Sequence, residues 1–387
     1  MSGQDWIKDE LGRISRAGLL RVLRSVGSMQ GPEIELDGMR VLNFCSNNYL
    51  GLAQDKRVIR AGVQAIKQWG ASSGASRLIA GNIGMLSELE NDLAGFKAYP
   101  AALVMNSGYQ ANLGLIPALA DEGGTIFSDE LNHASLIDGS RLSRARIEIY
   151  RHLDTSDLED RLKKATTVKQ RLIVTESLFS MDGDIAPLRE IIALAEKYNC
   201  LTLIDDAHAT GVLGKGGRGG LEHFGLNDQA DVVLSTMSKA LGSYGAFVCS
   251  SRSLREYLIN RTRSFVFATG LNPAALGAAM MSLKIIQEEP ARRKRLQDNI
   301  AYMRHGLEGL GIPLKPDHTP ILPVLLGSAD RTMRVCENLL GQGIFVQGIR
   351  PPTVPEGTSR LRITVSSEHT RNQMDQLVQE LKGLLWN

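Results

Sequence analysis

The feature that most constrains the fold is a regular alternation of short apolar runs and amphipathic segments, which begins near residue 100. The apolar runs have the length and composition of buried strands. The expected strands are Ala102–Met105, Thr125–Phe127, Ile147–Tyr150, Leu172–Thr175, Leu201–Ile204, Val232–Ser235 and Ala246–Ser250. Helical patterns fill most of the gaps, for example Pro187–Tyr198. The alternation predicts an α/β fold with a mostly parallel sheet covered by helices on both faces.

The two ends of the chain follow other patterns. Residues 4–25 and 57–69 have helical periodicity, and a short strand is expected at Arg40–Asn43. After residue 273 we expect a long helical segment to Leu310, interrupted near Pro290, and a closing helix at 369–385. Between them lie three expected strands, Ile321–Leu326, Ile344–Ile349 and Arg360–Val365. We therefore expect an N-terminal helix and strand (1–45), a large α/β domain (46–275) and a smaller α+β domain (276–387).

Composition excludes several classes of protein. Hydrophobic residues make up 43% and charged residues 22%, which is typical of a globular protein and not of a disordered one. Lys and Arg number 44 against 42 Asp and Glu, so bulk charge gives no case for binding nucleic acid or a membrane. The N-terminus lacks the apolar region of a signal peptide, and the longest apolar stretch, Leu271–Leu283, is too short to span a bilayer.

The four cysteines are widely spaced and form no CxxC pair. They are Cys45, Cys200, Cys249 and Cys336. This spacing indicates neither a disulfide framework nor a zinc site, so we expect reduced thiols in a cytoplasmic enzyme and no metal.

Two glycine-rich matches do not have the context that their motifs need. Gly214–Gly219 fits GxGxxG, but it does not open a helix directly after a strand. Gly70–Gly74 fits GxSxG, but an amphipathic helix precedes it, whereas a nucleophile elbow follows a buried strand. We expect neither dinucleotide binding nor serine hydrolase chemistry.

The residues that indicate chemistry follow two expected strands. Asp205 and His208 come after Leu201–Ile204, and Lys239 follows Val232–Ser235 in a turn rich in Ser, Thr and Gly. Ligands of open α/β sheets bind at such carboxyl ends. A partly buried lysine there has a lowered pKa and becomes nucleophilic toward aldehydes. A carboxylate on the neighbouring strand end can keep a pyridinium nitrogen protonated. Asp205 shares a strand face with Leu203, whereas Asp206 points the other way and is expected to be structural.

These residues belong to a larger set of motifs spread over nearly the whole chain. The set comprises Leu42–Leu52 (LNFCSNNYLGL), Gly74–Gly81 (GASRLIAG), Ser107–Asn112 (SGYQAN), Asn132–Ser135 (NHAS), Thr175–Asp184 (TESLFSMDGD), Asp205–His208 (DDAH) and Thr236–Lys239 (TMSK). Together they resemble the α-oxoamine synthases, which are pyridoxal-phosphate enzymes of fold type I. The resemblance implies that fold, this cofactor, and a homodimer with active sites shared between subunits.

The resemblance also assigns roles around the cofactor. Lys239 would form the Schiff base, Asp205 would pair with the pyridinium N1, and His133 would stack on the ring and touch the substrate. His208 and Ser180 would lie near the cofactor's O3′. The phosphate would be held by Gly108, Tyr109 and Thr236, and by Thr269 from the partner subunit. From the residues alone, His133 would more often be an ordinary capping or loop histidine, and His208 could be a core histidine with its hydrogen bonds satisfied. Ser107 is a suitable N-cap whose helix offers free N–H groups to a phosphate.

Substrate residues follow from the same resemblance. Arg362 would hold the amino-acid carboxylate, although Arg360 shares its strand face and one of the two arginines could simply be exposed. Asn47, His133, Thr353 and Arg21 would contact substrate. Arg13, Arg21 and Arg24 fall on one side of the expected N-terminal helix, which is either a solvated face or a site for the phosphates of an acyl carrier.

The wording of Ile349–Pro355 (IRPPTVP), with Gly357 and Thr358, resembles the branch of the family that serves biotin synthesis. This branch condenses L-alanine with a pimeloyl thioester, on coenzyme A or acyl carrier protein, with loss of carbon dioxide. The alternatives are a glycine-using synthase such as 2-amino-3-ketobutyrate ligase, or a regulatory protein that binds the cofactor without turnover.

Overall fold

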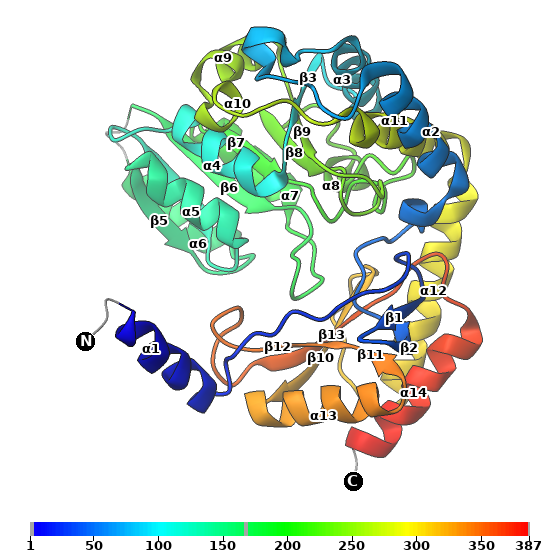
Figure 1. Cartoon of the computed structure of the whole chain (residues 1–387). Coiled ribbons are helices and arrows are strands. Elements are labelled where there is room, and N and C mark those ends of the chain that lie inside the picture. Colours follow the sequence, from blue (N-terminus) through cyan, green and yellow to red (C-terminus); the bar gives the residue numbers. More distant parts are fainter. Residues whose placement is uncertain (1–3, 166–168, 386–387) are drawn as a thin grey trace. The chain divides into compact units, whose positions relative to one another are not determined.

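The computed structural model describes residues 4–165 and 169–385 of the chain. It divides into two compact units (Figure 1). The larger unit is Asn47–Leu296, and the smaller combines Met1–Ser46 with Gln297–Asn387.

The larger unit is built on a seven-stranded sheet in the order β3-β9-β8-β7-β6-β4-β5 (Figure 1). Its strands are β3 (Ala101–Met105), β4 (Thr125–Asp129), β5 (Arg146–Tyr150), β6 (Arg171–Glu176), β7 (Leu201–Asp205), β8 (Val232–Thr236) and β9 (Ala246–Ser250). Only β9 runs antiparallel to its neighbours β3 and β8. The predicted mostly parallel sheet is confirmed.

Helices cover this sheet on both faces. They are α2 (Lys56–Trp69), α3 (Gly84–Lys97), α4 (Gly108–Leu119), α5 (Ala134–Ser143), α6 (Thr155–Lys164), α7 (Leu188–Lys197), α8 (Gly220–Phe224), α9 (Arg252–Arg261), α10 (Arg263–Val266) and α11 (Pro273–Glu288), with two short turns of helix, η1 (Leu52–Gln54) and η2 (Arg77–Gly81). Successive residues of β6, such as Ile173 and Val174, are both fully buried although they point to opposite faces. Burial of both faces is the normal state of a parallel sheet.

The strand directions bring the carboxyl ends of β3 to β8 to one edge of the sheet. The strands β4 to β8 are parallel to one another, and β3 has the same direction because both it and β8 are antiparallel to β9. The loops that follow these ends carry most of the expected site residues. Ligand sites of open α/β sheets lie at this edge.

The smaller unit contains two three-stranded sheets, β1-β2-β11 and β10-β13-β12. Its elements are α1 (Asp5–Arg16), β1 (Glu33–Leu36), β2 (Met39–Asn43), β10 (Ile321–Gly327), α13 (Ala329–Gly341), β11 (Ile344–Phe345), β12 (Gln347–Ile349), β13 (Ser359–Thr364) and α14 (Arg371–Leu385), and α12 (Pro290–Gly309) leads into it. Its core joins Phe44 of the N-terminal segment to Leu361 and Leu377.

Three expectations about these elements are corrected by the structure. The N-terminal helix ends at Arg16 and does not reach residue 25, because Gly18 takes a left-handed conformation (φ 66°) that breaks the helix. The single strand expected at Ile344–Ile349 is two strands, because β11 pairs with β2 and β12 pairs with β13. The strand β1, which pairs with β2, was not predicted.

The compact units have other boundaries than 45/46 and 275/276. Helix α11 falls within the larger unit because it packs against α2 and α3. The N-terminal segment falls within the smaller unit because β2 pairs with β11 there. The predicted interruption near Pro290 is confirmed, since α11 ends at Glu288 and α12 begins at Pro290.

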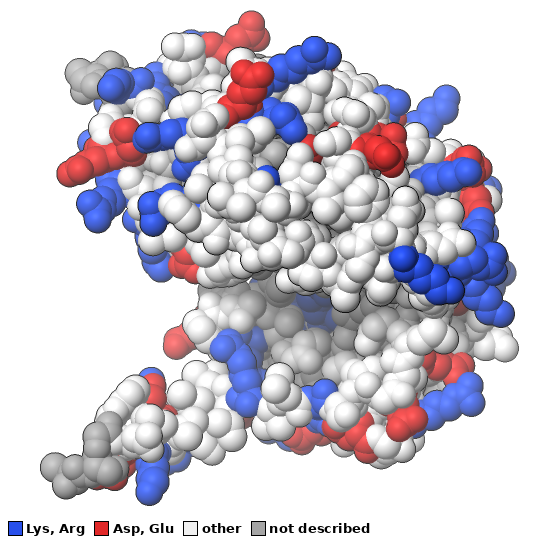
Figure 2. All heavy atoms as spheres, turned by 45° about the horizontal axis from the view of Figure 1, so that its top comes forward, with Lys and Arg blue, Asp and Glu red and all other residues white. Residues whose placement is uncertain are grey.

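The surface has mixed charge. Figure 2 shows Lys and Arg interspersed with Asp and Glu on the face that it presents. Within residues 4–165 and 169–385, no helix is long and apolar enough to cross a membrane.

Candidate active site

Asp205 is the last residue of β7, and its buried carboxylate is held by a side chain from helix α4. Nδ2 of Asn112 donates to Oδ2 of Asp205 at 2.8 Å and to Oγ of Ser135 at 2.9 Å. The backbone N–H of Ala207 donates to Oδ1 of Asp205 at 3.1 Å. Asp205 is 6% exposed, so these bonds fix a carboxylate that is almost completely removed from solvent.

His133 is the N-cap of α5, and its hydrogen bonds define its tautomer. Nδ1 accepts the backbone N–H of Ser135 at 3.2 Å, so the neutral ring carries its proton on Nε2. Burial lowers the pKa of His133 below its ordinary value, and the nearby Lys239 acts in the same direction, whereas Asp205 opposes them. The imidazole is therefore neutral near pH 7 and presents an N–H donor at Nε2.

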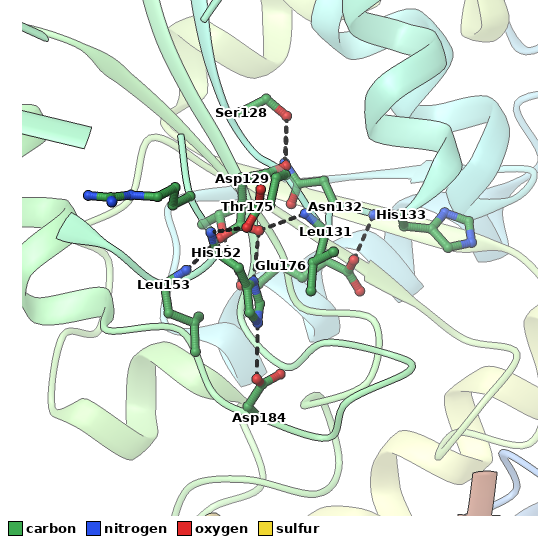
Figure 3. Close-up of polar contacts among 12 residues, drawn as sticks. Ser128, Asp129, Leu131, Asn132, His133, His152, Leu153, Thr175, Glu176 and Asp184 are labelled. Atoms are coloured by element: carbon green, nitrogen blue, oxygen red, sulfur yellow. Dashed lines mark hydrogen bonds and ion pairs between the residues drawn. The ribbon is translucent and has the colours of Figure 1, made fainter. Parts of the chain in front are cut away.

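Glu176 ends β6 beside Asp205, its partner in the strand register. Its Oε1 accepts the backbone N–H of His133 at 2.7 Å (Figure 3). Burial and, after it, the charge of Asp205 raise the pKa of Glu176 and Lys239 lowers it, which together leaves the pKa at about 8. Register pairing joins Glu176 to Asp205, and a hydrogen bond joins it to His133. Lys239 lies near enough to lower the pKa of both His133 and Glu176.

Lys239 lies in a hydrogen-bonded turn between β8 and β9. Gly242 donates its N–H to the Lys239 carbonyl at 2.9 Å, and Met237 donates to the carbonyl of Gly245 at 2.9 Å. The side chain of Lys239 is partly buried. The predicted setting, a lysine in a turn just past a strand end, is thus present.

Asp206 points away from Asp205 into a separate buried ion pair. Its Oδ2 contacts Nζ of Lys97 at 2.7 Å, and its Oδ1 accepts from Ser177 Oγ at 2.6 Å and from the N–H of Gly220 at 2.8 Å. These contacts fasten the end of β7 to α3 and α8. The structural role expected for Asp206 fits this geometry.

His208 and Ser180 are both buried at the same edge of the sheet, at 6% and 7% exposure. Nδ1 of His208 lies 2.8 Å from the hydroxyl of Tyr49, which in turn lies 3.2 Å from Oδ1 of Asn47. The expected substrate residue Asn47 is therefore joined to the expected cofactor residue His208 through a buried tyrosine.

Helix α4 begins at the same edge, after β3. Ser107 is its N-cap, as predicted, because Oγ accepts the N–H of Gln110 at 3.2 Å. The N–H groups of Gly108 and Tyr109 open the first turn, where no intrahelical acceptor exists. The hydroxyl of Tyr109 donates to Asp138, and its ring meets that of His133 edge-on with centroids 6.3 Å apart. The first turn of α4 thus offers an anion site near His133.

Two expected phosphate residues have other contacts within this chain. Oγ1 of Thr236 donates to the carbonyl of Gly245 at 3.0 Å and lies 2.6 Å from Ser238 Oγ. The backbone of Thr269 pairs with Ser76 and accepts from Asn106 Nδ2 at 2.8 Å, while its side chain is exposed.

The smaller unit carries the remaining expected substrate residues. Arg362 is 7% exposed in the middle of β13, and Arg360 is 4% exposed with Nε donating to the Thr358 carbonyl at 2.9 Å. The option that one of these arginines is simply exposed is wrong, because β13 is the central strand of its sheet.

Arg21 and Thr353 line one cavity of about 540 Å³ within the smaller unit. Arg24 also lines it and pairs with Asp37 at 3.1 Å. The expected helical face of Arg13, Arg21 and Arg24 does not exist, because α1 ends at Arg16. All three arginines are exposed, as the solvated alternative expected, and binding of the phosphates of an acyl carrier stays a prediction.

Several residues that build the site were missed as contributors. Glu176, Asn112, Ser135 and Tyr49 stand inside quoted motifs but were given no role, and Lys97 was not considered. Glu176 carried a usable signal, since it is an acid directly after a buried strand. Asn112 carried none, because its partner Asp205 lies 93 residues away.

The two glycine-rich matches have the expected context. Gly214–Gly219 is a loop that follows no strand directly, and Gly70 follows helix α2.

The comparisons with known proteins agree with this geometry. The family model for aminotransferase class I and II matches residues 39–381, and the chain belongs to that family. Two similar curated proteins are an 8-amino-7-oxononanoate synthase from Lysinibacillus sphaericus (46% identical, covering 98% of each chain) and 8-amino-7-oxononanoate synthase 2 from Bacillus subtilis strain 168 (44% identical, covering 99% of this chain and 98% of the relative).

Solved structures show the same fold. A serine palmitoyltransferase variant from S. paucimobilis, with a bound PLP–myriocin aldimine, has a TM-score of 0.93 at 31% identity and covers 99% of this chain and 97% of its own. An 8-amino-7-oxononanoate synthase from Francisella tularensis has a TM-score of 0.78 at 29% identity, over 89% of this chain and 98% of its own.

Proposed function

We propose that the chain is an acyltransferase that condenses L-alanine with a pimeloyl thioester and releases carbon dioxide and the free thiol. This is the reaction of an 8-amino-7-oxononanoate synthase in biotin synthesis. The observation that carries the proposal is the gathering of Asp205, His133, Glu176 and Lys239 at the carboxyl edge of the sheet. The similar curated proteins bear the same name.

The residues at this edge fit pyridoxal phosphate. The first turn of α4 supplies backbone N–H groups for a phosphate, and Asn112, one turn further along the same helix, holds the Asp205 carboxylate that suits a pyridinium nitrogen. Bound there, the cofactor supplies an electron sink for charge that develops at the amino-acid Cα. Gly108, Tyr109 and Thr236 would hold the phosphate, and His208 and Ser180 would lie near the ring oxygen.

The protein's own groups then act on the substrates. Lys239 would hold the cofactor through its ε-amino group and would serve as the base that removes the proton from the amino-acid Cα. Asp205 would keep the ring nitrogen protonated, and neutral His133 would face the ring with Nε2–H as a donor toward substrate. Arg362 binds the amino-acid carboxylate through its guanidinium fork, and Asn47, Arg21 and Thr353 contact the substrates.

We further propose that the chain acts as a homodimer in which Thr269 reaches the partner's phosphate site. Ile79 and Phe267, which flank the Ser76–Thr269 bridge in sequence, are 82% and 73% exposed, and exposed apolar groups of this size suit a subunit contact. Sedimentation equilibrium at micromolar protein checks this: twice the mass of one chain is expected, and a monomer would contradict it. A cytoplasmic location stays a prediction.

A panel of substrate pairs tests the function. L-Alanine or glycine is combined with pimeloyl-CoA, pimeloyl-acyl carrier protein or acetyl-CoA, and kcat/KM is measured from thiol release, with Lys239→Ala protein as the blank. L-Alanine with a pimeloyl thioester should give the highest value. A faster reaction of glycine with acetyl-CoA would replace the proposal by a glycine-using synthase. Cofactor binding without turnover on any pair would indicate the regulatory alternative.

A further inference from the structure

A second buried polar cluster lies beside the candidate site and surrounds His152, in the loop after edge strand β5. Nδ1 of His152 lies 2.8 Å from Oδ1 of Asp129, and Nε2 lies 3.0 Å from Oδ2 of Asp184 (Figure 3). The His152 side chain is 13% exposed and each carboxyl group 1%. One imidazole therefore bridges two carboxylates from different loops.

The two contacts match a charged imidazole between two carboxylates. A neutral histidine has one ring donor, and only the imidazolium can donate to both carboxylates. Burial lowers the pKa of His152, but the hydrogen bonds to Asp129 and Asp184 outweigh it and raise the pKa to about 9. Of the other charged groups nearby, Glu130 accepts the backbone N–H of His152 at 2.8 Å, and the adjacent Arg151 pairs with Asp154 at 2.7 Å.

Asp129 fixes the loop that carries His133. It is the last residue of β4, and its Oδ1 also accepts the N–H of Leu131 at 2.9 Å. The next residue, Asn132, donates from Nδ2 to Ser128 Oγ at 2.9 Å (Figure 3). The same nitrogen donates to the Val174 carbonyl at 2.9 Å. Hydrogen bonds thus hold most residues of the turn from Asp129 to His133 in place.

Asp184 fixes the loop that carries Ser180. The N–H of Phe179 donates to the Asp184 carbonyl at 3.0 Å, and the N–H of Gly183 donates to the Phe179 carbonyl at 3.0 Å. These bonds close a turn around Ser180. The ring of Phe179 packs edge-on against His152, with centroids 4.5 Å apart.

We propose that His152 is a positioning residue, which ties the loop of His133 to the loop of Ser180 and so sets the two side chains against the cofactor ring from neighbouring strand ends. The proposal rests on the proposed function, because His133 and Ser180 matter as a pair only where they face one bound group. It extends that function to a residue outside the motifs that indicated the family.

Two substitutions separate the two bonds of the bridge. His152→Asn places its amide nitrogen close to the position of Nδ1 and can keep the bond to Asp129, whereas His152→Gln places it near Nε2 and can keep the bond to Asp184. Neither carries the charge. The matched control is His223→Gln, at an exposed histidine of the same unit.

The holoenzyme is compared in three readouts. In wild type, NMR of ring-labelled histidine should show His152 titrating near pH 9, and the visible circular dichroism of bound pyridoxal phosphate should change in the same range. Both substitutions should lower kcat by about 10- to 100-fold, because a small misplacement of reacting groups has an effect of this size. They should also remove the circular-dichroism step near pH 9, which a general loss of stability would not do.

Several results would overturn the proposal. One is that His152 in wild-type protein titrates at the ordinary histidine pKa. This measurement requires neither a variant nor catalytic activity. Another is that His152→Asn and His152→Gln both fold and show the same kcat and the same visible circular dichroism as His223→Gln. If both variants fail to fold, Asp184→Asn is tested instead, because it keeps an acceptor oxygen but loses the negative charge. This substitution should lower the pKa of His152. An unchanged pKa of His152 would refute the bridge. The NMR and dichroism readouts remain valid if the substrate assignment fails.

Discussion

At the scale of single residues, the neighbouring acids Asp205 and Asp206 have different expected roles: Asp205 in catalysis and Asp206 in the stability of the fold. Asp205 is held by neutral donors from Asn112 and Ala207, whereas Asp206 is paired with the buried ammonium of Lys97. Losing one partner of a buried ion pair is far more costly than losing a charge whose hydrogen-bond donors are neutral.

Exchanging each acid for its amide tests this division. Asp205→Asn should lower kcat by about 100-fold or more while the free energy of unfolding of the cofactor-free protein changes little. Asp206→Asn should destabilise the fold by about 3–5 kcal/mol because Lys97 stays buried without its counter-charge. Urea unfolding and steady-state kinetics on both proteins give the answer, and the reverse assignment of effects would contradict the strand-face argument.

Glu176 provides a residue-scale prediction about pH. Its raised pKa of about 8 means that the native state holds the proton more tightly than the unfolded chain. Its contribution to stability is therefore fully present below the ordinary pKa near 4.5 and is lost as pH rises through about 8. In Glu176→Gln this titration is absent, while the amide oxygen can still accept the N–H of His133.

The expected outcome is a difference in the free energy of unfolding that changes with pH. In the cofactor-free protein, the free energy of unfolding of Glu176→Gln minus that of wild type should increase as pH rises from about 4.5 to 8. Glu176→Ala leaves the His133 N–H without its acceptor and should be about 1–3 kcal/mol less stable than Glu176→Gln at every pH. A pH-independent difference for the glutamine variant would show that the carboxyl group ionises normally.

At the scale of elements, the sequence predicted those helices and strands whose limits depend on the local residue pattern. Each strand of the seven-stranded sheet was expected within one or two residues of its position, because the runs are short, apolar and rich in β-branched residues. The division of residues 344–349 was not predictable, since it depends on pairing with β2 and β13, which lie far away in sequence. The N-terminal helix was overextended because apolar periodicity continues past Gly18, where the backbone turns.

The same distinction explains the site. Residues that directly follow strands, such as Asp205 and Lys239, could be found from the sequence because parallel strands bring their carboxyl ends together. The side chains that hold them in place could not. Asn112, Ser135 and Tyr49 come from helices or loops whose facing partners are decided only by the packed fold.

His369 gives a prediction at the level of elements in the smaller unit. Its ring stacks on Phe44, Nδ1 accepts the N–H of Ser366 at 2.9 Å, and Nε2 lies 3.1 Å from the Asn43 carbonyl. Burial lowers the pKa of His369 to about 4, although the two backbone hydrogen bonds oppose this. The neutral ring thus links the N-terminal segment to the loop before α14.

Because the native pKa is lower than the unfolded value near 6.5, this stabilisation is present above pH 6.5 and is lost as pH falls toward 4. The loss should be about 3 kcal/mol across that window. Urea unfolding of wild type and His369→Gln should therefore give stability differences that narrow as pH falls, with exposed His305→Gln as the control. Parallel curves for wild type and His369→Gln would contradict a neutral buried ring.

At the scale of the whole molecule, function divides between the two compact units. The larger unit holds Lys239, Asp205, His133 and the helix terminus that suit a phosphorylated cofactor. The smaller holds Arg362, Arg21 and Thr353, the residues expected to choose the substrates. Composition said little at this scale, because a nearly balanced charge gives no case for binding a polyanion and selects no substrate.

The most direct test of the central claim is to locate the cofactor's covalent attachment. Wild type and Lys239→Ala are incubated with pyridoxal phosphate, reduced with borohydride, digested and mapped by mass spectrometry. Wild type should carry one reduced adduct, on the peptide that contains Lys239, while Lys239→Ala should bind the cofactor without a covalent link and show no turnover. An adduct on another lysine, or none on wild type, would contradict the site assigned to the carboxyl edge of the sheet.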